Sequence, residues 1–297
     1  MLKKFKGIGL LILSNLLISI TLYIVFQLLA NVVLPAFGID LRDSINGSIM
    51  VYALVLGFGG AFISLLFSKQ MARAMLDCYQ VTEPHTRQEE IVFRTVRELA
   101  DRLRISMPEV WIYQAPDPNA FATGPTKNNA MVAVSTGLLE HMNEAEVRSV
   151  LAHEMGHVWN GDMFTITVLM GLMNTFVYFI ALWVRRLFEE RDQAGLGFIV
   201  SIVLQIALSI LAMLVINWYS RRREFEADRF SAKAYGPSQM ISALQSINRF
   251  AEEAQAQNAF SDPLATMKIS GDTGGWMSLF ATHPPIEERI AALQRYA

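Results

Sequence analysis

The residues best suited to chemistry in this chain are His153, Glu154 and His157, which form an H-E-x-x-H sequence. On a helix, positions i and i+4 share one face, so the two histidines can offer their imidazoles to one metal ion. Glu154 follows the first histidine directly, where its carboxylate can act as a general base toward water held at that metal. The alternative is a solvated amphipathic helix that carries two histidines by chance. We therefore predict a metal-dependent hydrolase.

The residues around this sequence predict a helix that begins at Asn143 and stops at Gly161. Asn143 followed by Glu146 has the spacing of a capping box, and glycine is a common helix stop. Apolar residues recur between them at helical spacing, which gives the helix a buried side. Burial favours the neutral imidazoles that bind metals. A longer form of the motif requires a histidine where this chain has Met163, so the third metal ligand must come from elsewhere.

Glu224 is the candidate third ligand. Glu224 and Asp228 are four residues apart on a predicted helix and share a face, whereas Glu226 points elsewhere. Two imidazoles and one carboxylate suit zinc and leave its fourth position open for water. Asp228 would then accept a hydrogen bond from a ligand imidazole and fix its tautomer. The alternative is a charge cluster in which both acids pair with nearby arginines.

The elements that must position these residues include long apolar stretches. The chain is 53% hydrophobic with a mean hydropathy of +0.31, too apolar for an ordinary soluble domain. Four uncharged stretches of about 20 residues or more, each able to cross a bilayer, account for the excess. They lie between Lys6 and Asp40, Asp43 and Lys69, Asp162 and Arg185, and Asp192 and Arg221. Buried core helices are the alternative, more so for the last two, which contain polar residues.

The flanking charges and the cysteine content predict an orientation. Basic residues are more numerous on the side that carries the N-terminus and the polar segments, which favours a cytoplasmic location for both. Cys78 is the only cysteine, so no intramolecular disulfide can form, as expected in a reducing compartment. The formal net charge of −2 gives no reason to expect nucleic acid as a partner.

Membrane and polar segments alternate along the chain. We predict an N-terminal transmembrane hairpin over residues 1–68, a first soluble segment over 69–162 that ends in the metal-binding helix, a second hairpin over 163–220, and a second soluble segment over 221–297. Two crossings separate His157 from Glu224, so the chain returns to the face that carries the histidines. The second hairpin thus explains how residues far apart in sequence can share one metal.

The first polar segment also predicts a helix over 88–104 and strands over 110–113 and 130–134. A strand beside a metal-binding helix can pair with an extended substrate through main-chain hydrogen bonds. This interpretation makes Ala130, Met131, Val132 and Ala133 candidate substrate-binding residues. The alternative is an internal strand of a small sheet.

Taken together, these motifs resemble the HtpX family of membrane-bound zinc metallopeptidases, relatives of the CAAX prenyl endopeptidases. The resemblance covers essentially the whole chain. It rests on the four-span layout and on the stretches Asn119–Gly124, Leu151–His157, Asn160–Asp162, Glu224–Asp228 and Thr282–Pro285.

The resemblance implies a mainly α integral membrane protein with about four transmembrane helices and a cytoplasmic, zincin-like α+β peptidase domain with a small sheet. It implies that His153, His157 and Glu224 bind one Zn²⁺ per chain, with Glu154 as the catalytic base and Asp228 behind the ligands. It also implies a place in the bacterial inner membrane, with the active site facing the cytoplasm. The implied role is quality control and stress response, with misfolded or damaged membrane proteins as polypeptide substrates.

Some interpretations remain open. His283 precedes Pro284 and a predicted final helix, so it is either a helix-initiating residue or a donor to the oxyanion of the reaction. Cleavage of prenylated C-termini is an alternative activity. A non-enzymatic membrane scaffold with a structural zinc is a further alternative, although structural sites fill all four coordination positions. The sequence does not specify the oligomeric state.

Overall fold

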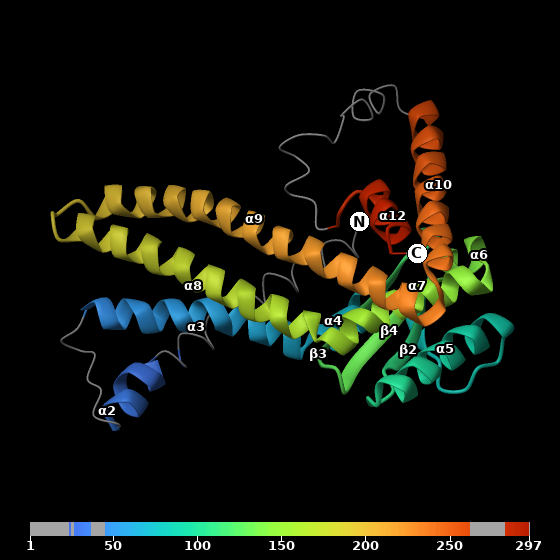
Figure 1. The fold of residues 1–297 in the computed structure, drawn as a ribbon. Coiled ribbons are helices and arrows are strands. Elements are labelled where there is room, and N and C mark those ends of the chain that lie inside the picture. Colours follow the sequence, from blue (N-terminus) through green and yellow to red (C-terminus); the bar gives the residue numbers. More distant parts are fainter. Residues whose placement is uncertain (1–23, 25–26, 37–44, 262–282, 297) are drawn as a thin grey trace. The chain divides into compact units, whose positions relative to one another are not determined.

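The structure is a computed structural model that describes residues 24, 27–36, 45–261 and 283–296 (Figure 1). The chain divides into two compact units. One unit comprises residues 1–64 and 167–213, and the other comprises residues 65–166 and 214–297. The second unit contains every candidate site residue, so the candidate site lies within one compact unit.

Long apolar helices make up the first unit. Within the described residues, three helices are long and apolar enough to cross a membrane: α3 (Ile45–Leu66), α8 (Asp162–Glu189) and α9 (Ala194–Tyr235). They coincide with the second, third and fourth predicted spans. The first predicted span lies largely outside the described residues, which show there only a π-helical turn, η1 (Leu29–Val33), and α2 (Leu34–Ala36).

Helix α9 extends well beyond its apolar part. It is 42 residues long, which corresponds to roughly 63 Å, about twice the thickness of a hydrocarbon core. Its charged C-terminal part begins at Arg221 and belongs to the second unit. The helix therefore continues unbroken through Glu224 and Asp228, as predicted.

The second unit contains a four-stranded sheet with the order β1-β2-β4-β3. Its strands are β1 (Cys78–Gln80), β2 (Glu109–Tyr113), β3 (Ala120–Thr126) and β4 (Asn129–Ser135). Strands β2 and β4 correspond to the predicted strands and pair in parallel, whereas β1 and β3 pair antiparallel to β2 and β4 respectively. We did not predict β1 or β3 as strands.

Strand β4 is an internal strand. Met131 is in register with Glu109 of β2 on one side and with Thr123 of β3 on the other. The prediction that Ala130, Met131, Val132 and Ala133 pair with substrate is therefore wrong, because Met131, Val132 and Ala133 are each in register with β2 on one side and with β3 on the other, and Ala130 precedes them in the same internal strand. The alternative, an internal strand of a small sheet, is correct. Among the described strands, β3 is the edge strand on this side of the sheet.

Alternation along β4 divides the packing between the two faces of the sheet. Ala130, Val132 and Val134 face the main core, together with α5 (Arg87–Leu103) and α7 (Glu144–Asn160). Met131 and Ala133 face the opposite side, where Ala72 and Leu76 pack at the end of α4 (Ser68–Met75). The short α6 (Thr136–His141) follows β4, while α10 (Pro237–Ser261) packs against α7 and α12 (Ile286–Gln294). The sheet and α10 thus hold α7 in a fixed place.

Candidate metal centre

Helix α7 is built by the local signals that the sequence shows. The Asn143 side chain accepts hydrogen bonds from the backbone N–H groups of Ala145 and Glu146, and the Glu146 carboxylate accepts one from the Asn143 N–H. Gly161 ends the helix in the left-handed conformation with φ of 68°, which glycine adopts without strain. This rigid helix presents His153 and His157 on one face, with their Nε2 atoms 3.2 Å apart and their rings almost perpendicular, at 83°.

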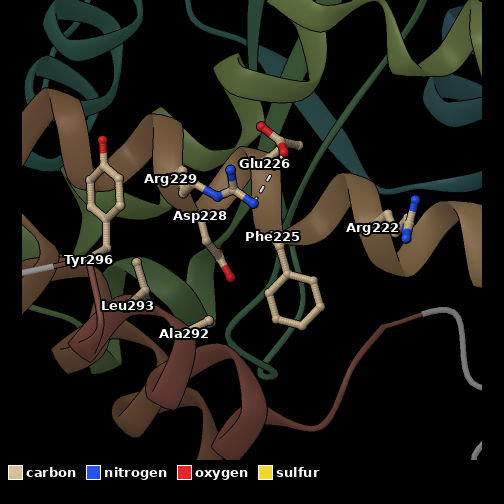
Figure 2. Close-up of a pocket in the computed structure, with 8 residues that line it drawn as sticks. All are labelled: Arg222, Phe225, Glu226, Asp228, Arg229, Ala292, Leu293 and Tyr296. Atoms are coloured by element: carbon tan, nitrogen blue, oxygen red, sulfur yellow. Dashed lines mark ion pairs between the residues drawn. The ribbon is translucent and has the colours of Figure 1, made fainter.

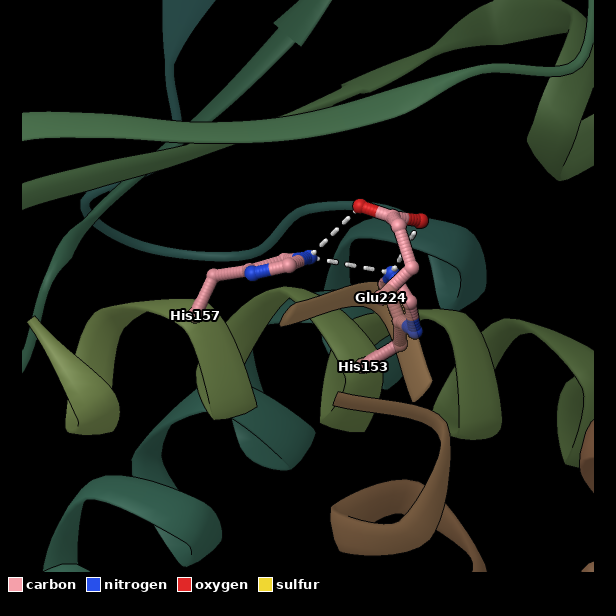
Figure 3. A group of neighbouring side chains, drawn as sticks. All are labelled: His153, His157 and Glu224. Carbon is pink, nitrogen blue, oxygen red and sulfur yellow. Dashed lines mark hydrogen bonds and ion pairs between the residues drawn. The ribbon is translucent and has the colours of Figure 1, made fainter. Parts of the chain in front are cut away.

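Glu224 on α9 completes a cluster with the two histidines (Figure 3). Its Oε1 lies 3.3 Å from His157 Nε2, and its Oε2 lies 3.6 Å from His153 Nε2. The two helices can approach closely because Gly156 has no side chain: a Cβ there would lie 3.2 Å from the Cβ of Phe230. The three candidate ligands from two distant segments thus converge on one point.

The spacing of these atoms matches that expected around zinc. Zn–N and Zn–O bonds of about 2.0–2.2 Å at a tetrahedral angle place neighbouring ligand atoms roughly 3.3–3.6 Å apart. The two Nε2 atoms are 3.2 Å apart, and each has a different Glu224 oxygen at a similar distance: Oε1 lies 3.3 Å from His157 Nε2, and Oε2 lies 3.6 Å from His153 Nε2. Two Nε2 atoms that face each other at this distance gain nothing from direct contact unless a proton or a cation lies between them. The cluster therefore fits a tetrahedral metal ion.

A carboxylate behind each histidine fixes its orientation. Asp228 Oδ1 lies 2.9 Å from His153 Nδ1, and Asp162 Oδ2 lies 2.7 Å from His157 Nδ1. A carboxylate at Nδ1 accepts a hydrogen bond from it, so each neutral ring carries its proton on Nδ1 and leaves the Nε2 lone pair free. Both histidines are thus held in the tautomer that a metal requires.

Two arginines in turn hold these carboxylates. Arg289 from α12 donates to both oxygens of Asp228, at 2.8 and 2.6 Å, and its Nη1 lies 3.4 Å from Glu224 Oε2. Arg223 from α9 donates to Asp162 Oδ1 at 2.6 Å. Asp162, Asp228 and Arg289 are all buried. Buried charges of this kind are tolerated only when they are paired, so the arrangement of these four residues is closely constrained.

The acids raise the proton affinity of the metal-free histidines. Burial lowers the pKa of His157, but the hydrogen bonds to Asp162 and Glu224 outweigh it and raise the pKa to about 10. For His153, burial is likewise outweighed by Asp228 and Glu224, and the net pKa is raised. A metal that binds here must therefore displace protons.

Glu154 and His283 lie beside the cluster. Burial raises the pKa of Glu154, and the charges that act on it belong to His153, His157, Glu224 and His283. His283 is 66% exposed, and its Nδ1 lies 2.9 Å from Glu224 Oε2. Glu154, with its raised pKa, and the exposed imidazole of His283 thus border the point on which the ligands converge.

The structure brings together all the metal-site residues singled out from the sequence: His153, Glu154, His157, Glu224, Asp228 and His283. Glu226 is exposed and pairs with Arg229, away from the cluster. Sequence reasoning did not predict that Asp162, Arg223 or Arg289 supports the histidines. The signals for Asp162 were its position directly after the helix stop and its place in the stretch Asn160–Asp162 that resembles the family. The partners of both arginines depend on the packing of distant helices.

Helix α9 also borders a cavity of about 480 Å³ (Figure 2). Residues of α9 and of the chain from α12 onward line it: Arg222, Phe225, Glu226, Asp228, Arg229, Ala292, Leu293 and Tyr296. Asp228 is the residue shared by this lining and by the hydrogen bonds of the histidine cluster. The cavity therefore adjoins the support of the cluster and not the convergence point of the ligands.

Comparison with known proteins identifies the family. A family model described as peptidase family M48 matches residues 86–297, which include every residue of the cluster. The chain belongs to peptidase family M48. Similar proteins include a protease HtpX homolog of Methylacidiphilum infernorum, 44% identical over 98% of this chain and 99% of the relative. Protease HtpX of Pasteurella multocida is 43% identical over 89% of this chain and 92% of the relative.

A solved structure shares the fold. Ste24p of S. mikatae superposes with a TM-score of 0.61 and 15% identity, covering 95% of this chain; the chain spans 66% of the length of that structure. With the apolar helices, these findings confirm the prediction of an HtpX-type membrane metalloprotease of the M48 family. They favour the peptidase interpretation over the scaffold and over cleavage of prenylated C-termini.

Proposed function

We propose that this metalloprotease binds one zinc ion through His153 Nε2, His157 Nε2 and a Glu224 carboxylate oxygen. The observation that carries the proposal is the convergence of these atoms while both Nδ1 atoms are held by buried aspartates. Three protein ligands leave one position open, which is typical of catalytic zinc sites and not of structural ones. Zinc bound here would supply a Lewis acid that polarises a peptide carbonyl and lowers the pKa of water.

Glu154 is the general base in this proposal. It takes a proton from the attacking water and passes the proton to the leaving amine as the peptide bond breaks. The raised pKa of its partly buried carboxyl group suits both steps, because such a group holds a proton more readily than a fully exposed carboxylate. His283, which is exposed beside Glu224, donates a hydrogen bond to the substrate carbonyl oxygen as negative charge develops on it.

The free edge of β3 is the candidate site for the substrate main chain. Strand β3 lies beside α7, and the described strands pair with it on one side only, through β4. An extended peptide can add to such an edge by main-chain hydrogen bonds, which depend little on the substrate sequence. Pairing with substrate was predicted for Ala130–Ala133 of β4, and the same main-chain hydrogen bonding is proposed here for the neighbouring strand β3.

We further propose that the substrates are misfolded or damaged membrane proteins and that the peptidase unit faces the cytoplasm from the inner membrane. The basic residues near the ends of the spans support this orientation, since Arg221, Arg222 and Arg223 follow the apolar part of α9 and Lys69 follows α3. Recognition through the main chain at β3 supports broad substrate use, as quality control requires.

The test compares wild type with Glu154→Gln, each purified in detergent. Metal content and cleavage of casein, an unfolded protein, are measured together. We expect about one zinc per chain in both proteins and chelator-sensitive cleavage by wild type alone. Glu226→Gln is the matched control, because Glu226 is exposed on α9, and it should retain both zinc and activity. Cleavage by Glu154→Gln at the wild-type rate would exclude Glu154 as the base.

A further inference from the structure

Helix α4 carries an apolar stripe that the second unit leaves exposed. Phe67 is the N-cap residue of α4, and Met71 and Met75 follow at intervals of four residues, so the three lie along one side of the helix. Their exposed fractions are 54%, 48% and 78%. Ala72 and Leu76, on another side, pack against the sheet. Single exposed apolar residues are ordinary, but three aligned on a short helix indicate a surface that something covers.

Contacts on the polar side of α4 hold this stripe outward. Lys69 Nζ lies 2.9 Å from Glu109 Oε1, and Arg73 pairs with the other oxygen of the same carboxylate. The Arg73 guanidinium also lies 4.8 Å from the ring centroid of Trp111, whose Nε1 donates to Glu109. A rotation of α4 that buried Met71 would break all of these contacts. The contacts of Lys69 and Arg73 with β2 therefore fix the orientation of α4 in which the stripe is exposed.

The position of α4 in the chain indicates what covers the stripe. The candidate span Gly47–Leu66 ends directly before Phe67 and is 20 residues long, which is roughly 30 Å and matches a hydrocarbon core. Phe67 therefore falls at the boundary between lipid and water. A helix there with an apolar side and with lysine and arginine elsewhere has the composition of helices that lie in the plane of the interface.

We propose that α4 lies in the headgroup layer of the lipid bilayer, with Phe67, Met71 and Met75 against the acyl chains. The peptidase unit then has a contact with the membrane in addition to its membrane-spanning helices. Helix α4 also lies beside β3. One consequence, which alone rests on the proposed function, is that the substrate-binding edge is held within reach of segments that leave the bilayer.

The depth of Met75 distinguishes this arrangement from an upright helix. Met75 lies eight residues after Phe67, which is about 12 Å along a helix. The headgroup layer of one leaflet is about 5–8 Å thick. In an upright α4, Met75 would therefore project into water, whereas in a helix parallel to the membrane it stays at the depth of Phe67.

The test uses the fact that Cys78 is the only cysteine in the chain. In a Cys78→Ser background, Met71→Cys and Met75→Cys are each labelled with the environment-sensitive fluorophore NBD. The labelled proteins are reconstituted into phosphatidylcholine vesicles that contain a lipid with a nitroxide near the headgroup end of its acyl chain. Arg102→Cys is the control, because the Arg102 side chain is 58% exposed on α5. Unchanged thermal unfolding verifies that the variants are folded.

We expect blue-shifted emission from the Met71 and Met75 labels and roughly threefold more quenching than in the control. Quenching of the Met75 label no stronger than that of the control would overturn the proposal. The proposal would also be overturned if the nitroxide lipid did not quench the Met75 label but added casein shifted its emission to the blue. That result would indicate that the stripe binds a polypeptide. The measurement needs no catalysis and can be repeated with Glu154→Gln, so its outcome is independent of the proposed activity.

Discussion

Replacement of Asp162 by asparagine tests whether the carboxylate behind His157 is needed for metal binding. Asp162 is 2% exposed and accepts from His157 Nδ1 at 2.7 Å and from Arg223 Nε at 2.6 Å. Asparagine has nearly the same shape but only one acceptor oxygen and no charge. Asp162→Asn therefore leaves either His157 or Arg223 without its partner.

The expected loss follows from these contacts. Both hydrogen bonds involve an ionised carboxylate, and such bonds are short and about twice as strong as neutral ones. Loss of the group that orients a metal-ligating histidine typically lowers metal affinity about 10- to 100-fold. This range corresponds to about 1.4–2.7 kcal/mol of binding free energy. We expect the zinc affinity of Asp162→Asn to fall within it.

The assay is a competition titration of purified protein against a zinc chelator of known affinity. Asp101→Asn is the matched control, because Asp101 is exposed on α5, and its zinc affinity should equal that of wild type. Asp228→Asn should weaken binding in the same direction, since Asp228 holds His153 as Asp162 holds His157. A folded Asp162→Asn protein with an affinity within about twofold of wild type would refute the orienting role.

Two further predictions concern the buried charges. Arg289→Met removes the partner of buried Asp228 and should cost about 3 kcal/mol of stability. This loss lowers the thermal unfolding midpoint, measured in the presence of chelator, by about 6–12 °C. Arg295 is exposed at the end of α12, so Arg295→Met should leave the midpoint unchanged, and equal midpoints for the two variants would contradict the role of Arg289. The pKa of His157, raised to about 10 without metal, predicts that zinc affinity rises with pH from about 6 to 8, because fewer protons must be displaced. The same raised pKa predicts the opposite trend for metal-free stability, since the contribution of His157 is complete below an unfolded pKa of about 6.5 and is lost as pH rises toward its folded value. Chelator competition and thermal unfolding across this pH range check both trends, and a zinc affinity independent of pH would contradict the first.

Local patterns allowed much of the site to be predicted. The capping box at Asn143, the glycine stop at Gly161 and the i, i+4 spacing of His153 and His157 all depend on contacts within one helix. Residues on one helix keep their relation in any fold, so this part of the site could be read without the structure. The same holds for Glu224 and Asp228, because the helix that carries them continues unbroken from an apolar span.

The strand at the substrate edge could not be predicted in this way. Both β3 and β4 are short strands beside α7, and only the parallel pairing of β2 with β4 makes β4 internal and leaves β3 at the edge. Strand order depends on contacts between residues far apart in sequence, and hydrophobic alternation does not reveal which neighbours a strand has. The prediction for Ala130–Ala133 was wrong for this reason.

By itself, the sequence determined the helix that carries both histidines, the third candidate ligand and the apolar spans, because periodicity and capping act over a few residues. Only the tertiary structure decided that Asp162 and Arg223 support His157, that Arg289 from the last helix supports His153 through Asp228, and that Phe67, Met71 and Met75 stay exposed. Each of these depends on how separate helices pack. The partner of a buried charge, and the exposure of an apolar side chain, depend on neighbours that are distant in the sequence and that the sequence pattern does not specify.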